Sequence, residues 1–272
     1  MLADWLELGF LRRALAAGLL SAVGCGLLSP YVVLRRMSFA GHGLAHAAFG
    51  GATLALLIGV NLSLGGTVFA CLLAVVLALW TRKGRVSEDS AIGMLVAASM
   101  ALGVVCLSLQ KRYTQDVFSF LFGNILACLP EDLIFSLGAT ALAVALALAL
   151  ARPLVSATFH EELAQVEGVP VDRMRLILFL LVAIEVVAAM KIVGAILVSA
   201  LLVLPGAIAL LFARRLVTVQ IASLAIGVAA VLIGMFASYL LDLPSGAVIA
   251  LVLFAGFGVT RGIVALQARF TR

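Results

Sequence analysis

The sequence is poor in charged residues. Only 18 basic and 13 acidic side chains occur among 272 residues, so charged residues make up 11% of the chain, against about 25% in an average soluble domain. Hydrophobic residues make up 65%, and the mean hydropathy is +1.27. The longest polar stretch covers only residues 156–175. This composition excludes a water-soluble protein and indicates one whose surface lies mostly in lipid.

Motifs that would indicate chemistry are also missing. The sequence contains no G-x-x-x-x-G-K-[ST] motif, so it has no P-loop with which to hydrolyse a nucleotide. It contains no H-E-x-x-H motif, because Gly43 follows the first histidine where a metalloprotease needs glutamate. The four cysteines form no C-x-x-C pair and indicate no disulfide framework. We therefore expect no enzyme activity from this chain alone.

Long apolar runs separate the few charged residues, at about 14–34, 43–60, 64–80, 90–110, 132–151, 174–190, 192–212, 216–241 and 246–266. An α-helix needs roughly 20 such residues to cross about 30 Å of hydrocarbon, whereas β-barrel strands alternate apolar and polar residues. We predict an all-α polytopic bundle of about eight to nine transmembrane helices, forming one membrane domain over residues 1–272. The run 116–129 is too short to span, so we expect it to lie in the interface or to re-enter.

The distribution of Lys and Arg predicts the orientation of the chain. With the N-terminus outside, 13 basic residues fall on the inner side and 5 on the outer side. We therefore predict a cytoplasmic C-terminus and a place in the cell (inner) membrane. The same asymmetry accounts for the net charge of +5, which indicates no nucleic-acid partner. The first 13 residues lack the positive start of a signal peptide, so we expect a retained interfacial segment.

Three kinds of residue stand out inside the apolar runs, namely Gly, Pro and Glu. Segments 14–34, 43–60, 64–80 and 216–241 are rich in Gly and Ala, which allow close helix packing in lipid. Pro205 with Gly206 interrupts the run 192–212, which predicts either the wall of a transport pathway or a packed kink. Glu185 is the lone carboxyl group in the run 174–190. It is either a pathway group, as metal ligand or proton carrier, or one partner of an interhelical hydrogen bond.

Two of the three histidines, His42 and His46, are four residues apart at the start of the run 43–60. Residues i and i+4 share one face of an α-helix, so two imidazoles there can bind one transition-metal ion together. Polar side chains at membrane depth are costly and often mark a transport site. The alternative is that both histidines are hydrogen-bonded to neighbours and only pack the bundle.

The polar stretch 156–175 contains the acidic run EELAQVE from Glu161 to Glu167. Its composition favours a helix, and Gly168 with Pro170 supplies a stop signal. We predict a short acidic helix on the cytoplasmic face, where another protein can dock. An ordinary loop between two membrane helices is the alternative.

Five stretches between about residues 30 and 250 follow one another in a recognisable order: VVLRRMSFAGHGLAHAAFGG, LFGNILACLPEDL, HEELAQVEGVPVDR, KIVGAILVSALLVLPGAIA and YLLDLPSGAVIAL. Together they resemble the permease subunits of the ABC importers for zinc and manganese, most closely the zinc-uptake permeases. The resemblance implies a homodimer of permeases, a cytoplasmic ABC ATPase subunit, and a periplasmic or surface metal-binding protein that delivers the ion. It also implies that the acidic helix, with Glu161, Glu162, Gly168 and Pro170, contacts the ATPase.

The resemblance further implies a metal site on the second segment, where the family carries a D-x-x-x-H pair. His46 stands at the position of the family histidine, and His42 replaces the aspartate. Exchanging a carboxylate for an imidazole removes a negative charge and shifts the preference toward zinc. Zinc is therefore the first candidate for the cargo, followed by manganese or iron, and no permanent cofactor is expected.

The expected function is therefore that of the permease in an ATP-driven divalent-metal importer, which moves the ion inward by alternating access. His42 and His46 are the predicted metal ligands, and Glu185 and Pro205 are candidates for the pathway. The alternative is a proton-coupled secondary transporter that uses Glu185 and needs no ATPase. An intramembrane metalloenzyme is disfavoured, because the sequence lacks its motif.

Overall fold

The structure is a computed structural model that describes residues 9–82, 86–109 and 128–270. Within these ranges all regular elements are helices, so the predicted all-α class is confirmed. The helices are α2 (Gly9–Leu34), α3 (Ala40–Leu57), α4 (Leu62–Thr81), α5 (Glu88–Ser108), α7 (Pro130–Ala149), α8 (Ala151–Phe159), α9 (Glu161–Val166), α10 (Val171–Phe212), α11 (Leu216–Leu241) and α12 (Ser245–Phe270).

Among the described residues, seven helices are long and apolar enough to cross a membrane, namely α2, α4, α5, α7, α10, α11 and α12. The predicted count of eight to nine is therefore too high. The runs 174–190 and 192–212 form the single helix α10. The run 43–60 falls in α3, which is not among the seven because its 18 residues include two histidines and four glycines. Most of the run 116–129, and residues 1–8, lie outside the described residues.

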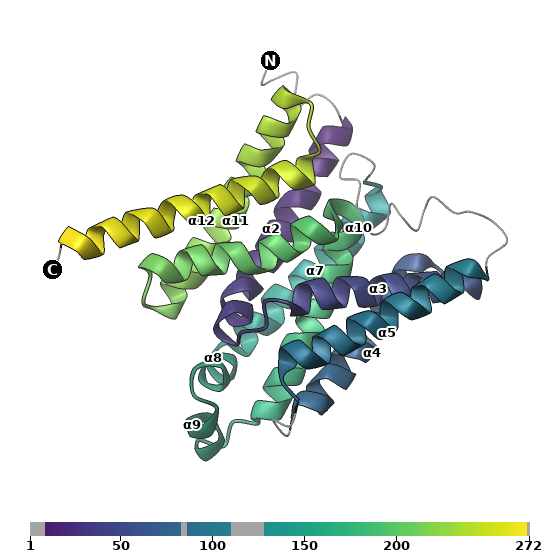
Figure 1. Ribbon diagram of the computed structural model, residues 1–272, viewed down its shortest axis with the longest axis horizontal. Coiled ribbons are helices and arrows are strands. Elements are labelled where there is room, and N and C mark those ends of the chain that lie inside the picture. Colours follow the sequence, from purple (N-terminus) through teal and green to yellow (C-terminus); the bar gives the residue numbers. More distant parts are fainter. Residues whose placement is uncertain (1–8, 83–85, 110–127, 271–272) are drawn as a thin grey trace.

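The long helix α10 is bent. Its 42 residues would extend about 63 Å if straight, roughly twice the thickness of the hydrocarbon layer. At Gly194 the backbone has φ 84° and ψ 157°, which is not helical and is readily adopted only by glycine. Figure 1 shows the two halves of α10 running in different directions. The backbone departs from helical angles at Gly194, whereas α10 continues as a helix through Pro205, where the sequence placed an interruption.

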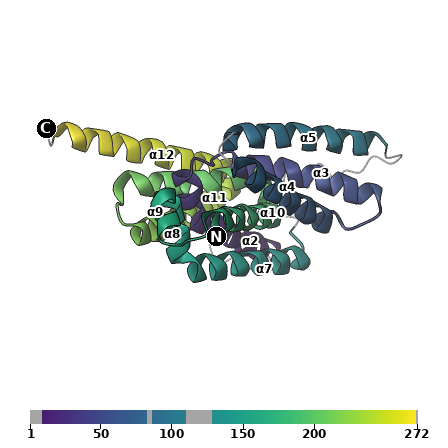
Figure 2. The same ribbon diagram turned by 90° about the horizontal axis from the view of Figure 1, so that it is seen from below.

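The helices α2 and α10 form the centre of the bundle. In each of them 72% of the most apolar window is buried, against 11% to 33% in the other five spanning helices. Helices α3, α4 and α5 pack together on one side of α10, and α11 and α12 pack on the other side (Figures 1 and 2). Helix α7 packs against α2 and α10. The outer helices therefore turn most of their apolar side chains outward, as expected in lipid.

Glycines allow the closest helix crossings. A β-carbon at Gly50 of α3 would lie 2.6 Å from the carbonyl oxygen of Ser99 in α5. Gly51 of α3 and Gly65 of α4 face one another in the same way, since a β-carbon at either would contact the backbone oxygen of the other within 2.9 Å. The predicted close packing of the glycine-rich runs is confirmed at these crossings, which hold α3 tightly between α4 and α5.

Candidate metal site and coupling surface

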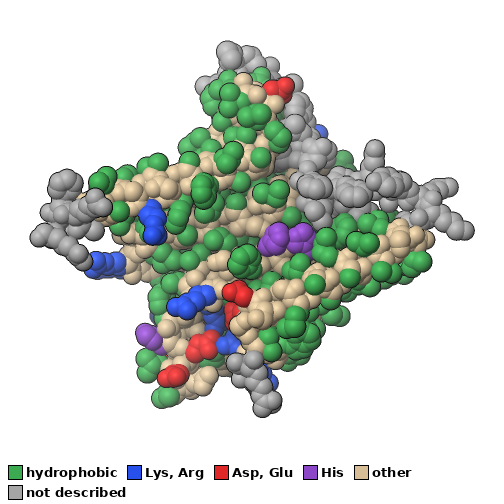
Figure 3. Space-filling view, viewed as in Figure 1, with side chains coloured by type: hydrophobic (Ala, Val, Ile, Leu, Met, Phe, Trp, Pro, Cys, Tyr) green, Lys and Arg blue, Asp and Glu red, His purple; other side chains and the backbone are tan. Residues whose placement is uncertain are grey.

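The first candidate site is a narrow open face at the start of α3. Most of α3 is buried against its neighbours: Gly41 packs on Leu202 of α10, and Gly43 packs on Ile92 of α5. On the remaining face His42 is exposed and His46 is half-buried. Figure 3 shows histidine side chains on the surface in the middle of the molecule, surrounded by hydrophobic ones. The fold therefore leaves the polar side of α3 uncovered.

The two histidines contact each other directly. The Nε2 atoms of His42 and His46 are 3.0 Å apart, so one imidazole N–H donates to the other ring. The ring centroids are 4.4 Å apart, and the ring planes are nearly perpendicular at 83°. Two nitrogens bound to one tetrahedral zinc ion at about 2.0–2.1 Å lie about 3.3 Å apart. A small opening of the pair therefore admits such an ion in place of the shared proton.

The pair is incomplete as a metal site by itself. The Nδ1 atom of His46 is buried and has no hydrogen-bond partner among the described residues. No group of three or more His, Cys, Asp or Glu side chains in the described part of the chain is arranged to hold a metal ion. Within the described residues, a single copy of the chain therefore offers two nitrogen donors at this face.

Glu185 lies elsewhere, at a crossing of three helices. Its side chain is fully buried in the first half of α10. The Thr140 hydroxyl of α7 donates to the carboxylate at 3.2 and 3.4 Å. A β-carbon at Gly24 of α2 would overlap the same carboxyl group. These contacts favour the interhelical hydrogen bond over an open pathway, and they do not join Glu185 to the histidine pair.

Pro205 also lies in a packed crossing. It is buried, and the N–H of the next residue, Gly206, donates to the Ser29 hydroxyl of α2 at 2.8 Å. That hydroxyl donates in turn to the carbonyl oxygen of Val203 at 3.3 Å. Ser29 thus binds backbone groups on both sides of the proline from the neighbouring helix α2. The contacts favour the packed kink over a pathway wall at this point.

The second candidate site is at the end of the bundle where α8 and α9 lie (Figure 1). The predicted acidic helix is confirmed as α9, followed by Gly168 with φ 80° and by Pro170 directly before α10. The side chains of Leu163 and Val166 on α9 are 59% and 86% exposed. Glu162 is exposed beside them. This end of the bundle therefore presents an apolar surface with an acidic neighbour.

Glu161 behaves differently from its neighbour Glu162. Its carboxylate accepts hydrogen bonds from Arg35 at 2.6 Å and from Arg175 at 2.8 and 3.0 Å. The Arg35 and Arg175 side chains are only 5% and 11% exposed. Burial lowers the pKa of Arg35, and the Glu161 carboxylate raises it. Glu161 therefore binds α9 to the bundle, a role that the acidic composition of the run did not indicate. Figure 3 shows charged side chains gathered at this end.

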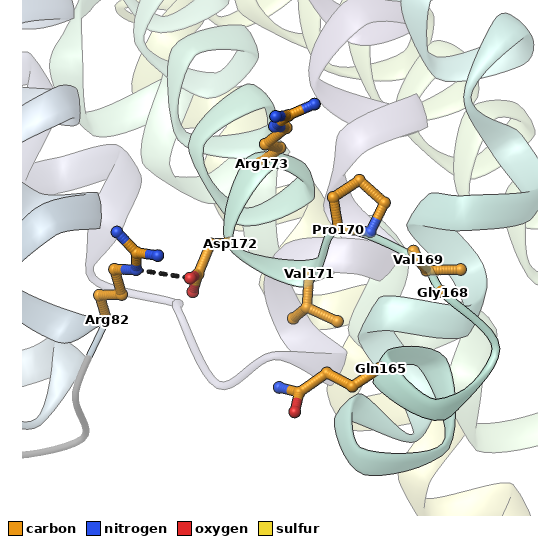
Figure 4. A pocket seen from close by; sticks show the side chains of 8 residues that line it. All are labelled: Arg82, Gln165, Gly168, Val169, Pro170, Val171, Asp172 and Arg173. Atoms are coloured by element: carbon orange, nitrogen blue, oxygen red, sulfur yellow. Dashed lines mark hydrogen bonds and ion pairs between the residues drawn. The ribbon is translucent and has the colours of Figure 1, made fainter.

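A groove of about 440 Å³ runs beside α9. Figure 4 shows Arg82, at the end of α4, paired with Asp172 at the start of α10, with a distance of 2.5 Å between Nε and Oδ2. Gly168 and Pro170 form part of the wall. Sequence reasoning missed this groove, because the basic residues after the run 64–80 indicated only the orientation. The groove is lined by Arg82, Gln165, Gly168, Val169, Pro170, Val171, Asp172 and Arg173.

Comparison with known proteins gives a consistent result. The model of the ABC 3 transport family matches residues 7–260. A "Probable metal transport system membrane protein" of Thermotoga maritima is 38% identical over 93% of this chain and 90% of its own length. The "Manganese transport system membrane protein MntC" of Halalkalibacterium halodurans is 34% identical over 91% of this chain and 85% of its own length. The solved structure "PsaBC from Streptococcus pneumoniae in complex with Fab" contains a chain with a TM-score of 0.84 and 30% identity, over 96% of this chain and 95% of that one.

Proposed function

Because the chain belongs to the ABC 3 transport family and is a multi-pass membrane permease of an ABC metal importer, we propose that its main cargo is zinc, with manganese or iron as further cargoes. The predicted family is thus confirmed, whereas the closer likeness to zinc permeases stays a prediction. Several relatives have names that refer to manganese. Zinc is therefore argued from the residues of this chain.

The observation that carries the proposal is the contact between His42 and His46 on the open face of α3. Two imidazole nitrogens at 3.0 Å form a donor set of nitrogen only. Imidazole suits zinc, whereas manganese prefers carboxylate and other oxygen ligands. Replacing the carboxylate of the family pair by His42 therefore favours zinc over manganese.

A second copy of the chain completes the metal site in this proposal. Structural zinc sites have four ligands, and catalytic sites have at least three from the protein. Within the described residues, a single copy of the chain supplies two ligands, on a face that its own helices leave open. Two copies that meet across these faces of α3 place four imidazoles around one ion. Closing and opening of this interface then changes the access of the ion from one side of the membrane to the other.

An ABC ATPase subunit is proposed to bind at α9 and the groove beside it. The exposed Leu163 and Val166, with Glu162 next to them, form the contact surface, and Gly168 and Pro170 set the turn behind it. Glu161 supports this surface from the inner side. In this proposal α9 and the C-terminus face the cytoplasm, in agreement with the distribution of basic residues. A metal-binding protein delivers the ion at the opposite end.

The experiment that tests the metal site measures uptake by the permease reconstituted in vesicles with its ATPase. We expect His42→Ala and His46→Ala each to lose most zinc uptake, and the double variant to lose it entirely. His160→Ala removes the remaining histidine, which is exposed beside α9, and should leave zinc binding by the detergent-purified dimer unchanged. Uptake of zinc and manganese at wild-type rates by the double variant would place the metal site elsewhere. Metal uptake without any ATPase would favour the proton-coupled alternative.

A further inference from the structure

Four charged side chains meet where α9 joins the bundle: Arg35 after α2, Glu88 in the first turn of α5, Glu161 in the first turn of α9, and Arg175 near the start of α10. They are called the four-charge cluster below. Arg35 and Arg175 both bind Glu161, and Nε of Arg175 lies 3.9 Å from Oε1 of Glu88. The cluster therefore joins the chain after α2 and the start of α5 to the consecutive helices α9 and α10.

The contacts within the four-charge cluster are unequal. Glu161 accepts three short hydrogen bonds, whereas in the described part of the chain Glu88 has one long contact, with Arg175. Oε2 of Glu88 and Nε of Arg175 are both buried and have no hydrogen-bond partner among the described residues. Unpaired polar atoms are costly when they are buried. A short movement of Arg175 toward Glu88 would pair both atoms in a second arrangement of the cluster.

The four-charge cluster is also connected to the histidine pair. Arg35 is followed by Arg36, whose backbone has φ 59°, and by a tight turn into α3, so that His42 comes seven positions after Arg35. Arg175 donates to the carbonyl oxygen of Thr81 at the end of α4, at 3.3 Å. Glu88 begins α5, which packs directly on α3. A displacement of α9 is therefore passed on to the turn that leads into α3 and to α4 and α5, which pack on α3.

We propose that the four-charge cluster transmits movement of α9 to the metal site, with Arg175 exchanging between Glu161 and Glu88. The proposal rests on the proposed function, since it assigns α9 as the contact of an ATPase. Arg35, Glu161 and Arg175 are then positioning residues, and Glu88 is the second partner that Arg175 needs. Breaking the exchange uncouples ATP hydrolysis in the partner from movement of the ion.

The two carboxylates distinguish this linkage from a purely structural role. If the cluster only anchors α9, Glu161→Gln is damaging and Glu88→Gln is silent, because the 3.9 Å contact is the one ion pair of Glu88 within the described residues. If Arg175 exchanges between them, both substitutions lower the number of ions moved per ATP hydrolysed. Arg175→Gln should behave like them, whereas Arg175→Lys keeps the positive charge but not the several donors of the guanidinium, and should retain part of the coupling.

The test measures zinc uptake and ATP hydrolysis in the same vesicles, which contain the full complex of permease and ATPase. We expect Glu88→Gln, Glu161→Gln and Arg175→Gln to lower the ratio of zinc to ATP by about tenfold or more, within the range of coupling between distant sites, while ATP hydrolysis continues. Ser156→Ala is the control, because it removes a hydrogen bond between the α8 region and Glu167 that lies outside the cluster. It should keep the wild-type ratio.

Each result of this experiment has a defined meaning. A wild-type ratio for Glu88→Gln would overturn the exchange of Arg175. A ratio for Ser156→Ala as low as that of the cluster variants would also overturn the proposal, because any loosening of α9 would then suffice. Gel filtration of each complex verifies assembly. If the wild-type complex hydrolyses ATP but takes up no metal, the proposed function fails, whereas normal uptake by wild type and Glu88→Gln alike rejects only the linkage.

Discussion

Substitutions at Glu185 and Gly24 test whether the buried carboxyl group of Glu185 packs the helices or carries protons. Glu185 is 0% exposed, and the Thr140 hydroxyl donates to it from α7. A β-carbon at Gly24 would overlap the Glu185 carboxyl group. A side chain at position 24 and the carboxyl group of Glu185 would therefore occupy the same space between α2 and α10. Substituting each of them alone and both together measures that competition.

The magnitudes follow from the contacts. Glu185→Ala leaves a cavity and removes the carboxylate partner of the Thr140 hydroxyl, which keeps its 3.4 Å hydrogen bond to the carbonyl oxygen of Leu20. Such truncations cost about 2–5 kcal/mol, partly offset because the buried carboxyl group itself is costly to desolvate, so we expect a loss of about 2–3 kcal/mol in the free energy of unfolding. Gly24→Ala overpacks the crossing and should cost about 1–3 kcal/mol. In the double variant the new methyl group occupies the emptied volume, so its loss should be smaller than the sum by about 1–3 kcal/mol.

Thermal unfolding of the purified permease in detergent measures these differences. About 2–4 °C of Tm per kcal/mol applies to chains of this size, so each single variant should unfold roughly 2–12 °C below wild type. The double variant should unfold above the temperature expected from adding the two shifts. Strictly additive shifts would refute the shared volume.

Glu185→Gln completes the test of function. Glutamine keeps the shape and accepts the hydrogen bond from Thr140, so we expect a Tm and a rate of zinc uptake near those of wild type. A variant that folds with normal Tm but no longer takes up metal would identify Glu185 as a proton carrier. Uptake would then have to be tested without the ATPase, since that outcome favours the secondary transporter.

Three further predictions concern the metal site, the orientation and the coupling surface. His42→Asp should retain uptake but shift the preference toward manganese, because it restores an oxygen ligand; competition between the two metals in uptake assays measures the shift, and an unchanged preference counts against ligation by His42. A cysteine introduced at Gln165, in a chain without native cysteines, should resist an impermeant thiol reagent in intact cells; labelling there would reverse the orientation. Glu162→Lys or Gly168→Leu should lower the metal-stimulated ATPase activity of the assembled complex, with the dimer intact on gel filtration, whereas normal stimulation by both excludes α9 as the contact.

Much of the fold and part of the candidate site follow from local properties of the sequence. Apolar runs of membrane-spanning length require helices, because lipid offers no partner for free backbone groups. The acidic run before Gly168 forms α9 because its residues favour a helix and the glycine adopts the left-handed backbone that ends it. The contact of His42 with His46 follows from the helical period alone. Each of these inferences depends on residues that are neighbours in the chain.

Only the tertiary structure decided where the remaining side chains point. Hydropathy divides α10 near Lys191, but it does not specify the backbone angles of Gly194, so the sequence predicted two separate helices. Glu161 and Glu162 are adjacent and identical in type, and only one of them binds Arg35, which is 126 positions away. The crossing of Glu185 with Gly24 and Thr140 likewise depends on how three helices rotate about their axes. Local propensity leaves that rotation undetermined, because it is set by long-range packing between helices whose apolar residues surround them on all sides.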